Sequence, residues 1–200
     1  VDEAHGAYLI SNLRPDLPKS ALSFGADLVV HSLHKSAPGL VQSAVLWSQG
    51  DMIDPFKIER SIEFLQTSSP SSLLLASCET AIKELIESKG QKKLISCIEE
   101  AESFSEFLIS HKVPLLTNND PLKIILHTSK FGLSGIEVDK KFIKKGMIGE
   151  LAEPGTLTFC LGFSNHKGLE KRFLRIWDEI SKSSNGKEKF PLFTKPPFSM

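Results

Sequence analysis

Two residues able to do covalent and electrostatic chemistry stand 33 positions apart in this sequence, each where a β-strand is expected to end. Lys35 follows the short, apolar, β-branched run of residues 26–30, and Asp2 opens a motif at the start of the chain. Ser32 and His34 flank the lysine. An amine can attack an aldehyde, and a carboxylate can keep a nearby ring nitrogen protonated. These residue types predict a site for a carbonyl compound with a basic ring.

Pyridoxal phosphate (PLP) is a cofactor with these requirements. It needs an amine to hold its aldehyde as a Schiff base and a carboxylate for its ring nitrogen, roles for Lys35 and Asp2. Its phosphate needs hydroxyl, imidazole or backbone donors, which Ser32 and His34 can supply. In open α/β sheets ligands bind beyond the carboxyl ends of strands, where both Asp2 and Lys35 are expected. We therefore predict PLP as the cofactor.

Several motifs resemble those of one family, the bacterial-type ornithine/lysine/arginine (Orn/Lys/Arg) decarboxylases. The resemblance covers most of the chain, to about residue 180. It rests on the lysine motif (residues 32–35 with 42–44), the aspartate motif (2–7), a Thr-Ser-Ser-Pro-Ser segment (67–71), and the start of a smaller domain (120–123 with 132–135).

The resemblance implies a fold and an activity. The expected fold is α/β, the PLP-dependent transferase fold type I, with part of the large-domain sheet followed by a small α+β domain. The expected reaction is decarboxylation of lysine, arginine or ornithine, which releases carbon dioxide and a polyamine precursor. The family likeness also implies a cytoplasmic homodimer or higher homo-oligomer.

The same resemblance assigns roles to individual residues. The catalytic set is Lys35, Asp2 and His34, with His34 either contacting the phosphate or taking part in proton transfer. The remaining cofactor-binding residues are Ala4, which lies against the ring, His5, Ser32, and the pair Thr67 and Ser68, which reaches across a dimer interface toward the partner's phosphate.

Simpler interpretations exist for several of these residues. An aspartate such as Asp2 is commonly a turn former, and Thr67 and Ser68 are good helix-capping residues. His31, at a predicted strand end, is interpreted as a structural histidine. The spacing of His5, His31 and His34 fits no helical metal-binding pair, so no metal is predicted.

The composition excludes some classes of partner. Lys and Arg total 24, as do Asp and Glu, so the net charge is +0 and gives no broad attraction to nucleic acid or to an anionic membrane. The three cysteines, Cys78, Cys97 and Cys160, form no CxxC motif and are expected to be free thiols. No apolar run reaches the length of a membrane span.

Hydrophobic periodicity divides the chain into four parts: part of the PLP-binding large domain (residues 1–78), connecting helices (79–112), the small domain (113–181) and a tail (182–200). Residues 26–30 are expected to form a buried parallel strand. Helices are expected over 53–65, 73–112 with a break at Gly90, 135–145 with Ile136, Phe142 and Ile143 inward, and 168–180. Further strands are expected over 43–47, 122–127 and 156–162.

Two alternative functions remain open. An aminotransferase of the same fold usually binds the substrate carboxylate with an arginine of the small domain, and residues 156–162 contain none. An inactive, truncated remnant of the decarboxylase is the second. The chain begins with Val1 inside a motif, so we expect a C-terminal fragment that is not a competent decarboxylase alone.

Overall fold

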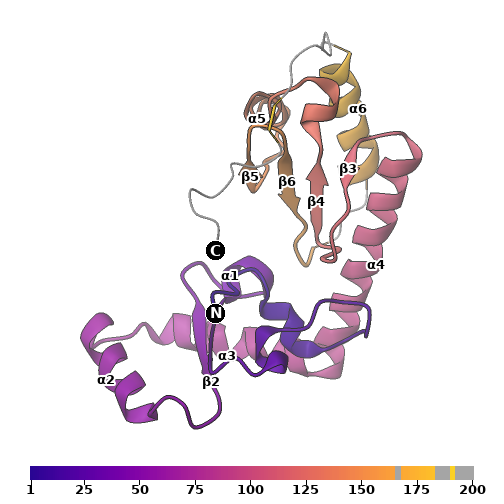
Figure 1. Cartoon of the computed structure of the whole chain (residues 1–200). Helices are drawn as coiled ribbons and strands as arrows, with labels where there is room; N and C mark the ends of the chain where they lie inside the picture. The colour runs from indigo at the N-terminus through magenta and orange to yellow at the C-terminus, as the bar shows by residue number, and fades with distance from the viewer. Residues whose placement is uncertain (165–167, 183–189, 192–200) are drawn as a thin grey trace. The chain divides into compact units, whose positions relative to one another are not determined.

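The computed structural model describes residues 1–164, 168–182 and 190–191 (Figure 1). Contacts divide the chain into two units, Val1–Ser96 and Cys97–Met200, and the boundary falls inside helix α4 (Ser88–Ser110). Most of the predicted tail lies outside the described residues. Each unit is described by itself below.

The first unit contains a two-stranded antiparallel pair and several helices. Strand β1 (Leu28–Ser32) pairs with β2 (Ala44–Ser48) from Leu28 opposite Ser48 to Ser32 opposite Ala44. The other elements are the 3-10 helices η1 (Ala7–Ser11) and η2 (Ala21–Phe24) and the α-helices α1 (Leu33–Ser36), α2 (Pro55–Leu65) and α3 (Ser72–Ile86).

The prediction of a buried parallel strand at residues 26–30 is only partly right. Its partner β2 is antiparallel, and Val30 is 40% exposed. A short apolar run signals a strand but does not specify which segment pairs with it. The parallel contact that does exist joins Val30 to Asp2.

Capping residues set the helix boundaries near α2 and α3. The Asp54 side chain accepts a hydrogen bond from the Phe56 N–H at 3.0 Å, and Pro55 occupies the first helical position, so α2 begins there. Ser71 caps α3 in the same way, since its Oγ accepts from Leu74 N–H. Helices expected at 53–65 and from 73 onward are thus confirmed to within two residues.

The long helical segment breaks at Glu87, not at Gly90 as predicted. Glu87 has an extended backbone (φ −77°, ψ 145°), while Gly90 lies within α4. A Cβ on Gly90 would fall on the Glu84 carbonyl group, so the glycine permits close packing of the two helices at their junction.

The second unit is built on a four-stranded antiparallel sheet. The strand order is β3 (Leu115–Leu116), β4 (Lys123–Leu126), β6 (Leu157–Cys160), β5 (Leu151–Ala152). The 3-10 helix η3 (Thr128–Phe131) follows β4, and helices α5 (Gly135–Lys144) and α6 (Leu169–Ser181) complete the unit (Figure 1). The second unit thus combines α-helices with an antiparallel sheet, and it begins at Cys97 and not at residue 113.

Four phenylalanines join the sheet to the helices of the second unit. Phe173 of α6 lies 5.0 Å from Phe142 of α5, 5.2 Å from Phe159 of β6 and 5.5 Å from Phe104 of α4, measured between ring centroids. All four side chains are buried. Edge-to-face and tilted contacts of this kind add to the area that the rings bury.

One prediction for α5 is partly wrong. Phe142 is fully buried, but Ile136 and Ile143 are 46% and 47% exposed. The buried face is instead formed by Val138 and Phe142, which are four residues apart and so share one side of the helix.

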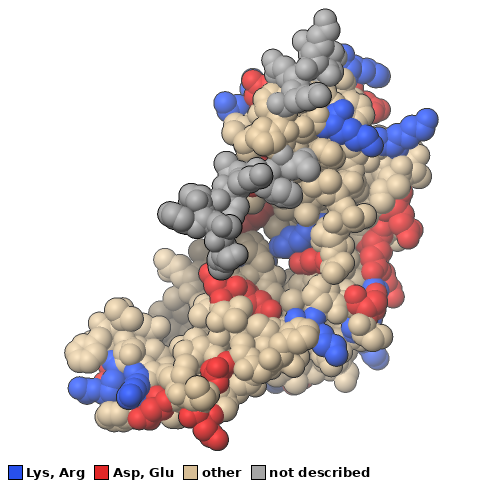
Figure 2. Space-filling model, viewed as in Figure 1, with Lys and Arg blue, Asp and Glu red and all other residues tan. Residues whose placement is uncertain are grey.

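The surface and the cysteines agree with the composition. On the surface over α2, basic and acidic side chains both appear (Figure 2). Cys78, Cys97 and Cys160 are free thiols, as predicted. Within the part of the chain that is described, no helix has the length and apolarity needed to cross a membrane.

We predict that Gly90→Ala lowers the free energy of unfolding by about 1–3 kcal/mol, because the methyl group would collide with backbone at the helix junction. Alanine normally favours a helix over glycine, so helix propensity alone predicts the opposite sign. Urea unfolding measures the difference. Ser96→Ala, at an exposed position of α4, is the matched control and should not be destabilising; a stabilised Gly90→Ala variant would contradict the packing argument.

Candidate cofactor site

The first four residues run parallel to β1 and are hydrogen bonded to it. Val30 N–H donates to Val1 O at 3.1 Å, Glu3 N–H donates to Val30 O at 3.0 Å, and Ser32 N–H donates to Ala4 O at 3.3 Å. Asp2 therefore lies beside Val30, and Ala4 lies beside the last residue of β1. The pairing thus brings the segment that contains Asp2 alongside the strand that precedes Lys35, while the predicted roles of the two residues stay predictions.

Lys35 follows β1 on the single helical turn α1. The chain passes directly from the strand into the helix, and Ala37 N–H closes the turn on Leu33 O at 3.0 Å. Leu33 is buried and anchors the turn, while Lys35 is exposed. Among the described residues Lys35 has no ion-pair partner, so its amine is available for chemistry.

His34 is held by one ring nitrogen. Its Nδ1 lies 3.0 Å from the Ser43 carbonyl oxygen, which can only accept, so Nδ1 carries a proton and donates. In the neutral ring Nε2 is then left with a lone pair. The same carbonyl accepts from Leu33 N–H at 3.0 Å, and the preceding residue, Gln42, has a left-handed backbone with φ 74°.

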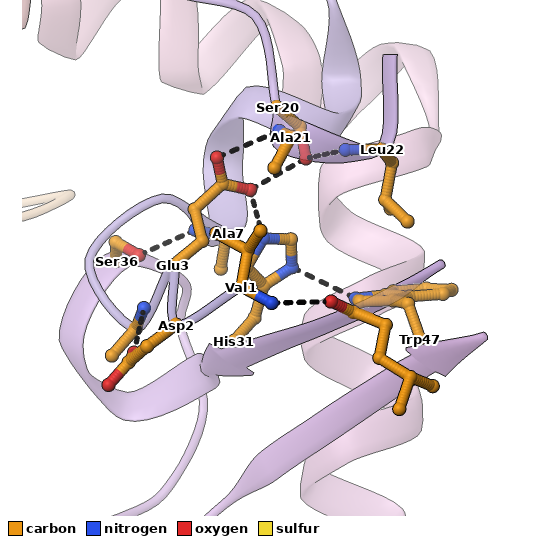
Figure 3. Close-up of polar contacts among 12 residues, drawn as sticks. Val1, Asp2, Glu3, Ala7, Ser20, Ala21, Leu22, His31, Ser36 and Trp47 are labelled. Atoms are coloured by element: carbon orange, nitrogen blue, oxygen red, sulfur yellow. Dashed lines mark hydrogen bonds and ion pairs between the residues drawn. The ribbon is translucent and has the colours of Figure 1, made fainter. Parts of the chain in front are cut away.

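Asp2 is exposed and uses one carboxylate oxygen locally. Its Oδ1 accepts from Ala4 N–H at 3.0 Å, which fixes the side chain beside its own backbone (Figure 3). No described residue forms an ion pair with it. Ala4 and His5 follow directly and are partly buried, and Ser32 is half-buried beside Ala4.

Two predicted site residues are not brought to this place. Thr67 and Ser68 lie in an exposed turn before α3, where Thr67 Oγ1 accepts from Ser69 N–H at 3.2 Å. No described contact joins them to Asp2 or Lys35. Their predicted role at a second subunit stays a prediction.

The structure reveals a buried polar network that the sequence analysis did not assign to the site (Figure 3). The Glu3 carboxylate accepts from Ser20 Oγ at 2.6 Å and from Ala21 N–H at 3.0 Å, and it lies 2.6 Å from His31 Nε2. On the other side of the ring, Trp47 Nε1–H donates to His31 Nδ1 at 2.9 Å. His31 is fully buried, as its interpretation as a structural histidine requires.

The environment of Glu3 favours its charged form. Burial raises the pKa of this carboxyl, but hydrogen bonds from Ser20, His31 and the Ala21 N–H more than offset burial and hold the pKa below its usual value. The signal that could have identified Glu3 is its alternation with Asp2, because neighbouring residues of a strand face opposite sides. The identity of its partners depends on tertiary pairing and has no local signature.

The donor set fits PLP. An exposed amine on the helical turn after β1, an imidazole on the same turn, and an exposed carboxylate on the segment paired with β1 are all present among the described residues. The cofactor requires an amine, a carboxylate and phosphate donors, and each type is present here.

A family model for "Orn/Lys/Arg decarboxylase, major domain" matches residues 1–118. The uncharacterized protein YaaO of Bacillus subtilis is 30% identical over 188 residues, which cover 90% of this chain and 38% of YaaO. An arginine decarboxylase of Bacillus anthracis is 33% identical over 150 residues, covering 70% of this chain and 30% of the relative. The chain thus spans about a third of the length of these relatives.

Solved structures of lysine decarboxylases have a similar fold. The constitutive enzyme of E. coli matches with a TM-score of 0.69 at 18% identity, over 87% of this chain and 32% of that one. The Francisella novicida enzyme matches with a TM-score of 0.65 at 19% identity, over 78% of this chain and 28% of that one. The family model, which covers more than half of the sequence, shows that the chain belongs to the Orn/Lys/Arg decarboxylase family.

Proposed function

We propose that this protein is a PLP-dependent decarboxylase of a basic amino acid, which releases carbon dioxide and an amine. One observation supports the proposal: residues 1–4 pair in parallel with β1, so that Asp2 lies beside Val30 of the strand from which Lys35 follows. An amine and a carboxylate are thereby held on adjacent backbone segments, as a cofactor with an aldehyde and a basic ring requires.

Each residue has a role that its contacts allow. Lys35 supplies the amine for the aldehyde, and Asp2 uses its second oxygen to keep the ring nitrogen protonated. PLP, when bound, supplies an electron sink for the pair left behind as carbon dioxide departs. His34 offers an Nε2 lone pair in its neutral form and can therefore take up a proton, or donate to an anionic group once protonated.

The remaining predicted residues complete the proposed cofactor site. Ala4 leaves room for the ring, while His5 and Ser32 lie next to it in the sequence and the pairing. Thr67 and Ser68 are proposed to contact the phosphate bound by a second copy of the protein. The proposed assembly is thus a homodimer or larger homo-oligomer, and the proposed location is the cytoplasm.

We propose arginine as the first substrate to test. Three relatives that are 29–33% identical over 150 residues, from Bacillus anthracis, Bacillus cereus and Halalkalibacterium halodurans, are named arginine decarboxylases. Because the chain spans about a third of each, the activity of the whole protein is inferred from part of it. Product analysis with arginine, lysine and ornithine in turn tests the substrate class.

Borohydride reduction of the complete, PLP-treated protein should leave a pyridoxyl group on Lys35. The exposed amine on α1 is the one presented beside Asp2, so peptide mapping is expected to find the label there. Lys35→Arg keeps the charge but should lose the label, whereas Lys57→Arg, at an exposed position of α2, should keep it. A label on another lysine in the wild-type protein would refute the assignment.

Asp2→Asn should lower kcat by about 100-fold while retaining most cofactor binding, because a neutral amide cannot stabilise a protonated ring nitrogen. Cofactor absorbance and steady-state decarboxylation measure the two effects separately. Asp51→Asn, at an exposed position of the same unit, is the control and should behave as wild type. Equal turnover of Asp2→Asn and wild type, with cofactor bound, would exclude the role.

A further inference from the structure

Glu3, next to Asp2 in the sequence, forms a polar network with His31 of β1 and Trp47 of β2 (Figure 3). We propose that these three residues act as a positioning clamp, which holds residues 1–4 and β1 in the one register that aligns Asp2 with Lys35. The catalytic part of this inference rests on the proposed function. The clamp itself is a statement about how two backbone segments are held together.

The backbone alone specifies this register weakly. Four backbone hydrogen bonds join residues 1–4 to β1: the three described above and one from the Val1 amino group to Leu28 O at 2.7 Å, and the segment is short. A slip by one residue would turn Asp2 to the opposite face. A slip by two residues would keep the face but move Asp2 along β1 by about 7 Å, since a strand rises about 3.3 Å per residue. Either slip would separate Asp2 from the position that Lys35 requires.

The side-chain network resists both slips. Glu3 adjoins Asp2 and His31 precedes Lys35 by four residues, so the 2.6 Å contact between Glu3 and His31 links the two motifs directly. Alternation along a strand puts Glu3 on the face opposite Asp2. His31 is 0% exposed and the Glu3 side chain is 16% exposed, so the clamp works from the buried side of the pairing. Its members are therefore positioning residues and not catalytic ones.

Each hydrogen bond of the network can have its donor on one side only. An indole N–H can only donate, so His31 Nδ1 must accept from Trp47, and the ring proton must sit on Nε2 and point to Glu3. Glu3 then accepts from three donors, His31, Ser20 Oγ and Ala21 N–H. A residue at position 31 that cannot both donate to Glu3 and accept from Trp47 would leave buried polar groups without hydrogen-bond partners, which lowers the stability of the fold.

This polarity provides a sharp test at His31. A glutamine can mimic the ring, because its amide NH2 can donate to Glu3 while its oxygen accepts from Trp47. Leucine fills similar space but can do neither. We expect His31→Leu to lower kcat by about 10- to 100-fold, as misplacement of reacting groups by about 1 Å can do, while KM changes far less. His31→Gln should retain most of the wild-type kcat.

Amide hydrogen exchange tests the clamp without any catalysis. In the protein without cofactor, the amides of Glu3, Val30 and Ser32 should exchange faster in His31→Leu than in wild type and in His31→Gln. Thr156→Val is the matched control: it removes another buried hydroxyl–carboxylate bond, 3.1 Å to Glu153, in the other unit, and should change neither these amides nor kcat.

The outcomes separate the two proposals. If wild-type holoenzyme releases no carbon dioxide, the proposed function fails, and exchange still decides whether the clamp exists. Equal exchange and equal kcat in His31→Leu and wild type would overturn the clamp, as would equal losses in His31→Leu and His31→Gln.

If His31→Leu does not fold, Trp47→Phe provides a second test, because it removes only the indole donor. It should give a smaller loss of kcat and faster exchange of the same amides. Wild-type values of both would overturn the clamp.

Discussion

The parallel pairing of residues 1–4 with β1 is the constraint on which the candidate site depends. It joins a segment at the start of the chain to a strand almost thirty residues later. Neither Asp2 nor Lys35 contacts a described charged partner, so their relative position comes from backbone and buried neighbours and not from attraction between them. The geometry of the candidate site is thus set by the backbone pairing and by the buried residues next to it.

The interiors of the two units differ in their most prominent contacts. The second unit has a continuous apolar core in which rings from three helices and a strand meet around Phe173. The first unit includes buried polar residues, among them Ser20, His31, Ser36 and Ser43, each with a hydrogen-bond partner. Polar networks specify direction and register more narrowly than apolar packing does. Such a network suits the first unit, in which the exposed residues Asp2 and Lys35 must keep fixed positions.

Local chemistry in the sequence predicted some features and could not predict others. Strand ends, the Asp2 and Lys35 motifs and the capped start of α2 follow from short-range patterns. The antiparallel partner of β1 could not be predicted, because the sequence of an apolar strand does not specify which segment pairs with it. Gly90 was misassigned because glycine both ends helices and permits close packing, and only the fold separates these uses. Glu3 and Trp47 were missed because their partners lie far along the chain.

The Ser43 carbonyl holds together the two ends of the segment between β1 and β2 (residues 33–43), which carries Lys35. It accepts hydrogen bonds from both Leu33 N–H and His34 Nδ1. Ser43 also donates to the Leu40 carbonyl, from its N–H at 3.0 Å and from its Oγ at 2.6 Å, so one serine joins the turn that carries Lys35 to the exposed residues 40–42. The side chains of Val41 and Gln42 are exposed, so exchanges there leave these contacts in place. In evolutionary terms, related proteins can vary the exposed side chains at positions 41 and 42 while the amine of Lys35 stays in place.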